Sequence, residues 1–179
     1  MDLLLLQPGD PGFFLGLKDL GVAPPSGATT TGPCLPLLSL AQDLRQPPIT
    51  APGAVPSGPP ILDGLGCTRT PDGLSVEFYD RCLRGVPLGV GQEQPTYLYV
   101  SRPAGAAPAV FLTLALRDAR ISAIQFQAHP DEPPVETFTL SFSEILWIYA
   151  MRRADGTPMG QTHNGWSLTL NRPIASFSD

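Results

Sequence analysis

Alternating apolar and polar residues in the stretch 133–174 limit the fold more than any other feature of this sequence. Apolar side chains occupy every second position from Phe138 to Phe142, with threonine and serine between them. This is the period of a β-strand with one buried face. The apolar positions then shift by one residue, which a β-bulge near Ser143 or Glu144 would explain. The core positions that the pattern predicts are Phe138, Leu140, Phe142, Ile145, Trp147, Tyr149, Trp166 and Leu168.

A second alternating run extends from Trp166 to Leu170. Two dipeptides typical of turns, Asp155-Gly156 and Asn164-Gly165, lie between the runs, and His163 stands beside the second of them. We therefore predict two strands joined by a polar connection, with His163 as a turn residue.

Composition favours short strands and turns over helices. The 179 residues include 22 prolines and 18 glycines, and only 15% are charged. This length suits a single domain spanning 1–179. A formal net charge of −5 argues against a general binder of nucleic acid or of anionic membranes, which would need an excess of Lys and Arg.

The first ten residues, MDLLLLQPGD, predict a strand rather than a signal peptide. They lack a basic start, and Pro8 interrupts the apolar run before a signal sequence could be completed. No apolar stretch approaches the roughly 20 residues needed to cross a bilayer. We expect the protein to begin in the cytoplasm, without membrane insertion.

Residues 24–60 hold ten of the 22 prolines. Because proline lacks a backbone donor, we expect a Pro-rich insertion or extended loop here, with a possible helical turn at 35–44. Such a loop is either disordered or an interaction arm. Its PPITAP motif is compatible with a polyproline ligand.

The stretch LSVEFYDRCLRG, residues 74–85, predicts the one convincing helix. Leu74, Phe78 and Cys82 fall on one face at four-residue spacing, and Gly85 is placed to end the helix. Residues 94–102 and 109–128 read as further strands, with a break at Arg117-Asp118. Strands at this spacing around one helix predict a mainly β fold, a small closed or nearly closed antiparallel barrel.

Taken in order, these stretches resemble the haemolysin-coregulated protein (Hcp) family, the tube subunit of bacterial type VI secretion systems. The likeness covers about residues 61–174. It rests on the helix, on FLTLALRDARISAIQF, and on a final third that matches a family pattern of Glu, alternating Ser and aromatic residues, Ile-x-Trp-x-Tyr, Gly-Trp and Asn. The matching residues are Glu136, Phe142, Ile145, Trp147, Tyr149, Gly165, Trp166 and Asn171. Residues 8–60 depart from the family, which usually has a less Pro-rich strand pair there.

The resemblance implies a structural protein whose hexameric rings stack into a tube. It further implies a contractile sheath, a spike and secreted effectors as partners, and export through the injection apparatus. Leu146 and Ile148 point away from Trp147 and are also apolar, so that a ring neighbour or the helix would cover them. A phage-tail-like tube protein and a monomeric Pro-rich binding module remain alternatives.

Catalytic and metal-binding chemistry find little support in the sequence. His129, Asp131 and Glu132 are adjacent in a Pro-rich turn and lack a well-spaced further ligand. Cys82 lies on the apolar stripe of the expected helix, where a packed thiol is the usual explanation. The motifs of common hydrolases and nucleotide-binding enzymes are absent from the sequence. We therefore expect no enzymatic activity and no cofactor.

Overall fold

The computed structural model describes residues 3–14, 33–48, 53, 58–104, 107–153 and 157–178. Thirteen strands and one helix occur within these ranges. They are β1 (Leu3–Gln7), β2 (Leu35–Leu37), β3 (Ser39–Ala41), β4 (Leu44–Arg45), β5 (Ile61–Leu62), β6 (Leu65–Arg69), α1 (Ser75–Arg84), β7 (Thr96–Ala104), β8 (Ala107–Arg117), β9 (Arg120–His129), β10 (Glu132–Ser141), β11 (Glu144–Arg152), β12 (Pro158–Ser167) and β13 (Arg172–Ile174).

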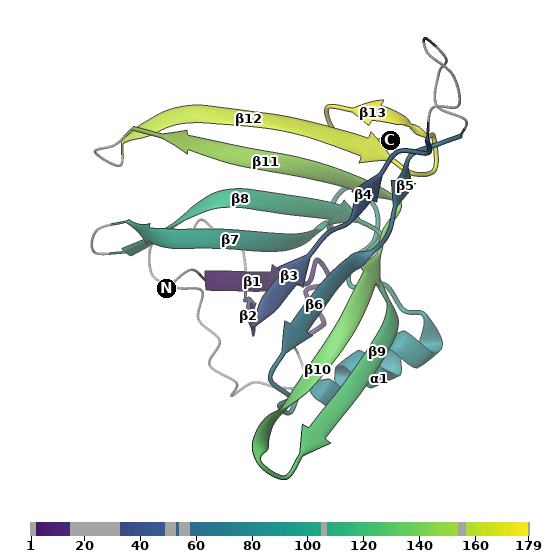
Figure 1. Ribbon diagram of the computed structural model, residues 1–179, viewed down its shortest axis with the longest axis vertical. Coiled ribbons are helices and arrows are strands. Elements are labelled where there is room, and N and C mark those ends of the chain that lie inside the picture. Colours follow the sequence, from purple (N-terminus) through teal and green to yellow (C-terminus); the bar gives the residue numbers. More distant parts are fainter. Residues whose placement is uncertain are drawn as a thin grey trace.

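The strands form two antiparallel sheets and a two-stranded ribbon (Figure 1). The larger sheet has the order β13-β12-β11-β8-β7-β1-β2, and the smaller one β3-β6-β10-β9. The ribbon is β4-β5. In Figure 1 the two sheets diverge, so that the β11–β12 and β7–β8 hairpins extend to one side and the β9–β10 hairpin extends downward. The prediction of a mainly β, antiparallel fold is confirmed.

The helix predicted from LSVEFYDRCLRG is α1. Asp72 accepts a hydrogen bond from the backbone N–H of Leu74 at 2.8 Å, which satisfies one of the unpaired donors at the helix start. Gly85 follows the last turn with a φ of 63°, in the left-handed region that glycine enters at little cost. The helix buries Phe78, whose ring meets Phe138 of β10 edge to face at a centroid distance of 5.0 Å.

One main hydrophobic cluster joins both sheets and the helix. It draws on β1, β2, β6, α1, β7, β8, β10 and β11, and its fully covered members include Leu6, Leu65, Phe78, Leu116 and Ile145. A second, smaller cluster on the opposite face of the larger sheet contains Leu5, Cys34 and Tyr99. The larger sheet therefore carries apolar residues on both faces.

The change of pattern between Phe142 and Ile145 is a change of sheet, and the expectation of a bulge within one strand is wrong. β10 ends at Ser141 in the smaller sheet, and β11 begins at Glu144 in the larger one. Phe142 and Ser143 make the crossing, and the Ser143 N–H donates to the Arg117 carbonyl at 3.0 Å. A corner between sheets and a bulge both move the buried set by one residue, so periodicity alone does not separate them.

The expected helical turn at 35–44 is also wrong, because the chain forms strands there. β2 pairs with β1, and β3 pairs with β6. Both strands have only three residues and lie at sheet edges, where Pro36 of β2 can lack an N–H without breaking a ladder. The other part of the Pro-rich segment, residues 24–32 and 49–57 apart from 53, lies outside the described residues.

Asn164-Gly165 and His163 lie inside β12 and form no turn. His163 pairs with Ile148, and Gly165 pairs with Leu146. A Cβ atom at Gly165 would stand 2.4 Å from the Leu146 side chain and 2.7 Å from the Ile145 carbonyl oxygen. Close approach of the neighbouring strand therefore explains this glycine. Asp155-Gly156 lies outside the described residues.

Candidate assembly surfaces

Leu146 and Ile148 lie on the face of β11 opposite Ile145 and Trp147, half-buried in the single chain. The helix does not cover them. They line a cavity of about 390 Å³ together with Tyr97 and with the C-terminal residues Ala175 to Phe177. The C-terminal segment thus partly covers Leu146 and Ile148, for which the sequence analysis expected cover from a ring neighbour or from the helix.

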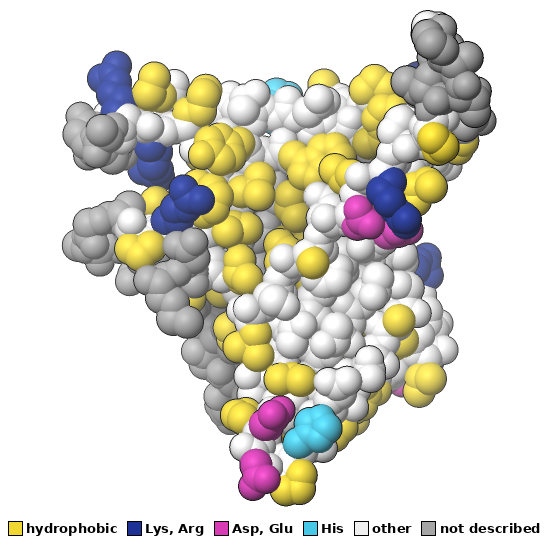
Figure 2. Space-filling view, in the orientation of Figure 1, with side chains coloured by type: hydrophobic (Ala, Val, Ile, Leu, Met, Phe, Trp, Pro, Cys, Tyr) yellow, Lys and Arg dark blue, Asp and Glu magenta, His cyan; other side chains and the backbone are white. Residues whose placement is uncertain are grey.

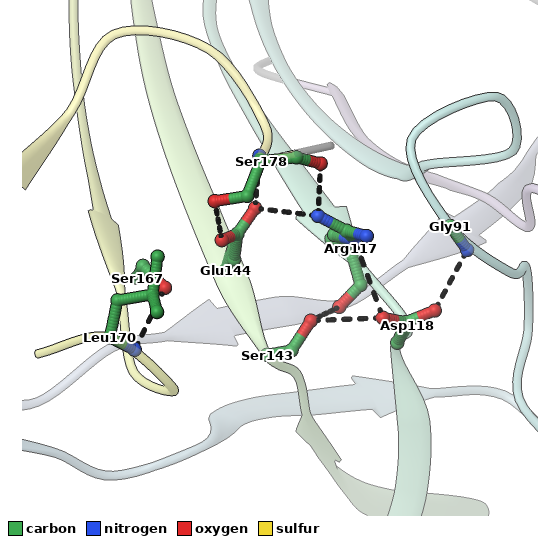
Figure 3. Close-up of polar contacts among 8 residues, drawn as sticks. All are labelled: Gly91, Arg117, Asp118, Ser143, Glu144, Ser167, Leu170 and Ser178. Carbon is green, nitrogen blue, oxygen red and sulfur yellow. Dashed lines mark hydrogen bonds and ion pairs between the residues drawn. The ribbon is translucent and has the colours of Figure 1, made fainter.

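A buried carboxylate fixes this C-terminal segment (Figure 3). Glu144 accepts hydrogen bonds from the backbone N–H of Ser178 at 2.9 Å and from its hydroxyl at 2.6 Å. Arg117 donates both to Glu144, at 3.3 Å, and to the Ser178 carbonyl. Glu144 and Arg117 therefore bind the N–H and the C=O of Ser178, the two backbone groups that a neighbouring strand would bind in a sheet.

The same contacts determine the protonation of Glu144. Burial raises its pKa, but the hydrogen bonds from Ser178, Ser167 and Arg117 outweigh burial and hold the pKa below its ordinary value of 4.5. The group is therefore an anion at neutral pH. This clamp could not be predicted from the sequence, because Arg117, Glu144 and Ser178 are 27 to 61 residues apart along the chain.

The two tryptophans lie together on the core face of the larger sheet. Trp147 and Trp166 line a cavity of about 330 Å³ whose other wall is the β4-β5 ribbon, with Leu44 and Ile61. The Trp147 indole N–H donates to the Gln42 side-chain oxygen at 2.8 Å. Both rings are partly buried and pack against the main cluster. They fix the ribbon against the end of the sheet.

The remaining predicted core residues differ in their exposure. Phe138, Leu140, Phe142 and Ile145 are buried, and Leu168 is partly buried against the main cluster. Tyr149 is 44% exposed, and its ring meets Phe111 edge to face at 6.1 Å. It shares the alternation of Ile145 but lies beyond the part of the sheet that the other elements cover.

A buried ionic group joins the helix to the smaller sheet. Glu136 accepts a hydrogen bond from the Tyr79 hydroxyl at 2.5 Å and has Arg69 at 3.9 Å. The Arg69 guanidinium also pairs with Asp72 and lies over the Phe78 ring, 4.8 Å from its centroid. Glu136 was noticed in the sequence as a family match, while its partners were not. The group positions the helix against the smaller sheet.

Two long strand edges have no partner in the described part of the chain: the whole of β9, and residues 158–164 of β12, which β13 does not reach. β9 has ten residues and lies at the end of the smaller sheet, with β10 on one side only. The other terminal strands, β2, β3 and β13, have three residues each. Short strands are a usual way to prevent pairing with other chains, and β9 lacks this protection.

The smaller sheet has one apolar and one polar face. The face away from the helix carries small uncharged side chains, and Figure 2 shows it as a largely white surface above the β9–β10 turn. Across it, Thr68 and Thr137 pair directly. The residues of this face are Ser39, Ala41, Gly66, Thr68, Ala123, Gln125, Thr137 and Thr139.

The residues weighed for catalysis or metal binding do not assemble into a site. His129, Asp131 and Glu132 lie exposed at the β9–β10 turn. No group of three or more potential metal ligands occurs among the residues that the structure describes. Burial raises the pKa of the Cys67 thiol to about 12, so that it is not a nucleophile at neutral pH. Cys82 is half-buried against the main cluster.

A search of the described residues finds no helix with the length and hydrophobicity to span a membrane.

Comparison with known proteins identifies the fold. No family model matches the sequence, and no curated protein matches it. Solved structures do match over nearly the whole chain. One is described as a type six secretion system protein, with a TM-score of 0.73 and 17% identity, covering 97% of this chain and 100% of the other. Hcp1 from Salmonella typhimurium has a TM-score of 0.65 and 17% identity, covering 97% and 99%.

A third match is the secreted protein Hcp3 from Pseudomonas aeruginosa, with a TM-score of 0.52 and 13% identity, covering 90% of this chain and 95% of the other. These matches confirm the resemblance inferred from the sequence, and they cover more of the chain than the stretch 61–174 on which that resemblance rests. None of the three is described as an enzyme. The chain has the fold of the Hcp proteins of type VI secretion systems.

Proposed function

We propose that this protein is a tube subunit of a type VI secretion system, whose copies form hexameric rings that stack into the inner tube. The observation that carries the proposal is the match of the fold from end to end with a type six secretion system protein. Contractile sheath and spike proteins are the further partners proposed, with effectors as possible cargo. Export from the cytoplasm through the apparatus belongs to the same proposal.

The long free edge of β9 supports a role in assembly. A strand edge exposes a row of backbone donors and acceptors that another chain can pair with. Because the opposite edge of the smaller sheet, β3, is a different strand, pairing of β9 with a neighbour's β3 would be heterologous and could close into a ring. The uncharged face of the smaller sheet would then continue from subunit to subunit.

Light scattering of the purified protein at micromolar concentration tests the ring. We expect a mass of about six times the 19.0 kDa of one chain, and ring-shaped particles in negative-stain images. Hydrogen exchange adds a residue-level test, in which amides of β9 become more protected on assembly. A protein that stays at 19.0 kDa would count against the proposal.

Substitutions on β11 test whether Leu146 and Ile148 belong to the interface. We expect Leu146→Asp or Ile148→Asp to lower the assembled mass and to leave the unfolding midpoint of the monomer nearly unchanged, because a half-buried side chain can turn to solvent. Leu83→Asp is the control, since Leu83 is 87% exposed on α1. An Ile148→Asp protein that unfolds would place this side chain in the monomer core, and an unchanged mass would remove it from the interface.

A further inference from the structure

Most of the described charged side chains form ion pairs within the chain, and four of those that do not lie at two separate places. The ion pairs involve Arg45, Arg69, Arg81, Arg84 and Arg117. Arg102 and Arg153 take part in none of the ion pairs among described residues, and the same holds for Asp131 and Glu132. The two arginines lie at the ends of the long hairpins of the larger sheet, and the two acidic residues lie at the β9–β10 turn.

The arginines flank an exposed apolar area, the distal patch, at the far end of β8 and β11. Tyr149 is 44% exposed, and Met151 is 39% exposed. A register shift between β7 and β8 brings two consecutive residues of β8 onto this face. Figure 2 shows apolar side chains over the strands of the larger sheet with basic groups beside them. The distal patch consists of Phe111, Leu112, Tyr149 and Met151.

Arg102 is held in place at the edge of the distal patch. Its guanidinium lies over the Phe111 ring, 4.1 Å from the centroid, while the side chain as a whole remains exposed. Stacking on an aromatic face leaves the N–H groups around the guanidinium rim available to a carboxylate. Arg153 follows Met151 by two residues and is exposed as well. The patch thus combines apolar contact area with fixed positive charge.

The β9–β10 turn has the opposite charge and a stiff backbone. Asp131 and Glu132 are exposed there between Pro130 and the pair Pro133-Pro134. Figure 2 shows the two acidic groups at the lower tip of the molecule, away from the basic groups. Prolines limit the conformations of the turn before binding, which lowers the entropy lost when it docks. We call this segment, residues 129–134, the acidic tip.

We propose that the acidic tip of one copy docks on the distal patch of a second copy, with Asp131 and Glu132 beside Arg102 and Arg153. This inference rests on the proposed self-assembly and names one of its contacts. The charges are complementary, and the prolines of the tip offer apolar area to Phe111, Tyr149 and Met151. Because the two surfaces differ, the contact is heterologous and propagates through rings or stacks.

Two charge-reversed variants test the contact. Variant A carries Arg102→Glu and Arg153→Glu, so that both of its surfaces are acidic. Variant B carries Asp131→Arg and Glu132→Arg, so that both are basic. Each alone places like charges together, and we expect the concentration for half-assembly to rise about 10- to 100-fold. An equimolar mixture restores opposite charges at every contact, and assembly should return toward the wild-type midpoint.

Light scattering and analytical ultracentrifugation measure assembly, and thermal unfolding shows that each variant is folded. Variants that assemble like the wild type would overturn the proposed contact while leaving the tube proposal intact. A wild-type protein that remains monomeric would instead overturn the proposed function, and this contact with it. As a control, Arg84→Glu with Asp80→Arg reverses an exposed pair on α1 and should leave assembly unchanged. Raising the salt concentration from about 0.05 to 0.5 M should weaken the wild-type contact through screening.

Discussion

Apolar side chains on one face of β8 and β11 meet two different environments along the same strands. At the near end, Leu116 and Ile145 are fully covered by the main cluster. At the far end, Tyr149 and Met151 remain exposed in the single chain. On β11 the period-two pattern is the same at both ends, while the elements packed against the two ends differ. Among the described residues, no element covers the far ends of these strands, which is where the docking contact proposed above is placed.

The largest expected difference between the near and far ends is in folding stability. Phe138→Ala removes a buried ring of the cluster that covers the near end, and should lower the free energy of unfolding by roughly 3–5 kcal/mol. Tyr149→Ala, at the far end, should change it by less than about 1 kcal/mol. Urea unfolding measures both. Equal losses would mean that the far end belongs to the monomer core.

The buried ionic group provides the next test, because it fixes the helix that helps to cover the near end. Glu136→Ala leaves Arg69 without one of its two acidic partners, and we expect a loss of about 3 kcal/mol. Asp80→Ala breaks the exposed pair with Arg84, and should cost less than about 1 kcal/mol. Urea unfolding of the two variants gives the comparison. A small effect for Glu136→Ala would show that Asp72 alone compensates Arg69.

A smaller effect is expected where the same helix ends. Gly85→Ala should lower stability by about 1–2 kcal/mol, because alanine is strained at a φ of 63°. Nothing lies within 4 Å of the added Cβ atom, so backbone conformation alone is responsible. Gly73→Ala is the matched control, since its Cβ atom also meets open space and its φ is not positive. Thermal unfolding of the two variants separates the strain at a positive φ from the general effect of a glycine-to-alanine change.

An element of the fold could be predicted from the sequence where the pattern that specifies it lies within a short stretch of residues. The helix was predictable from the spacing of Leu74, Phe78 and Cys82 and from Gly85, because periodicity and the end of the helix are encoded within twelve residues. The strand β2 was missed, because three residues that include Pro36 show no alternation. The buried residues on either side of Pro36, Leu35 and Leu37, fit a helical turn and a short strand equally well.

The surfaces were harder to predict than the elements. Tyr149 follows the alternation of Ile145, yet its exposure depends on how far the smaller sheet and the helix extend in space. The clamp of Glu144 on Ser178 joins residues 34 positions apart through a corner between sheets. Neither relation produces a periodic pattern in the sequence. Sequence reasoning therefore identified the strands and the family resemblance, but not which parts of the strands a single chain covers.

The smallest expected effect concerns the C-terminal segment, which partly covers the other face of β11. Because the folded-state pKa of Glu144 is lowered by Ser178, Ser167 and Arg117 against the effect of burial, its contribution to stability is present above pH 4.5. This contribution is lost as the pH falls through the lower folded-state pKa. Glu144→Gln should therefore be less stable than the wild type at pH 7, and the difference should shrink below pH 4.5.

Urea unfolding at a series of pH values measures the difference in free energy of unfolding between Glu144→Gln and the wild type. The other carboxylates titrate in both proteins, so their contributions cancel in this difference. The exposed Glu93 serves as the control, and Glu93→Gln should leave the stability at pH 7 nearly unchanged. Hydrogen exchange locates the effect, because the Ser178 amide loses a charged acceptor and keeps only a weaker, neutral one when Glu144 is protonated. If assembly uses Leu146 and Ile148, release of the segment below pH 4.5 should also change the assembled mass. A Glu144→Gln difference that stays constant from pH 7 to pH 3 would mean that packing, and not the charge of Glu144, holds the segment on β11.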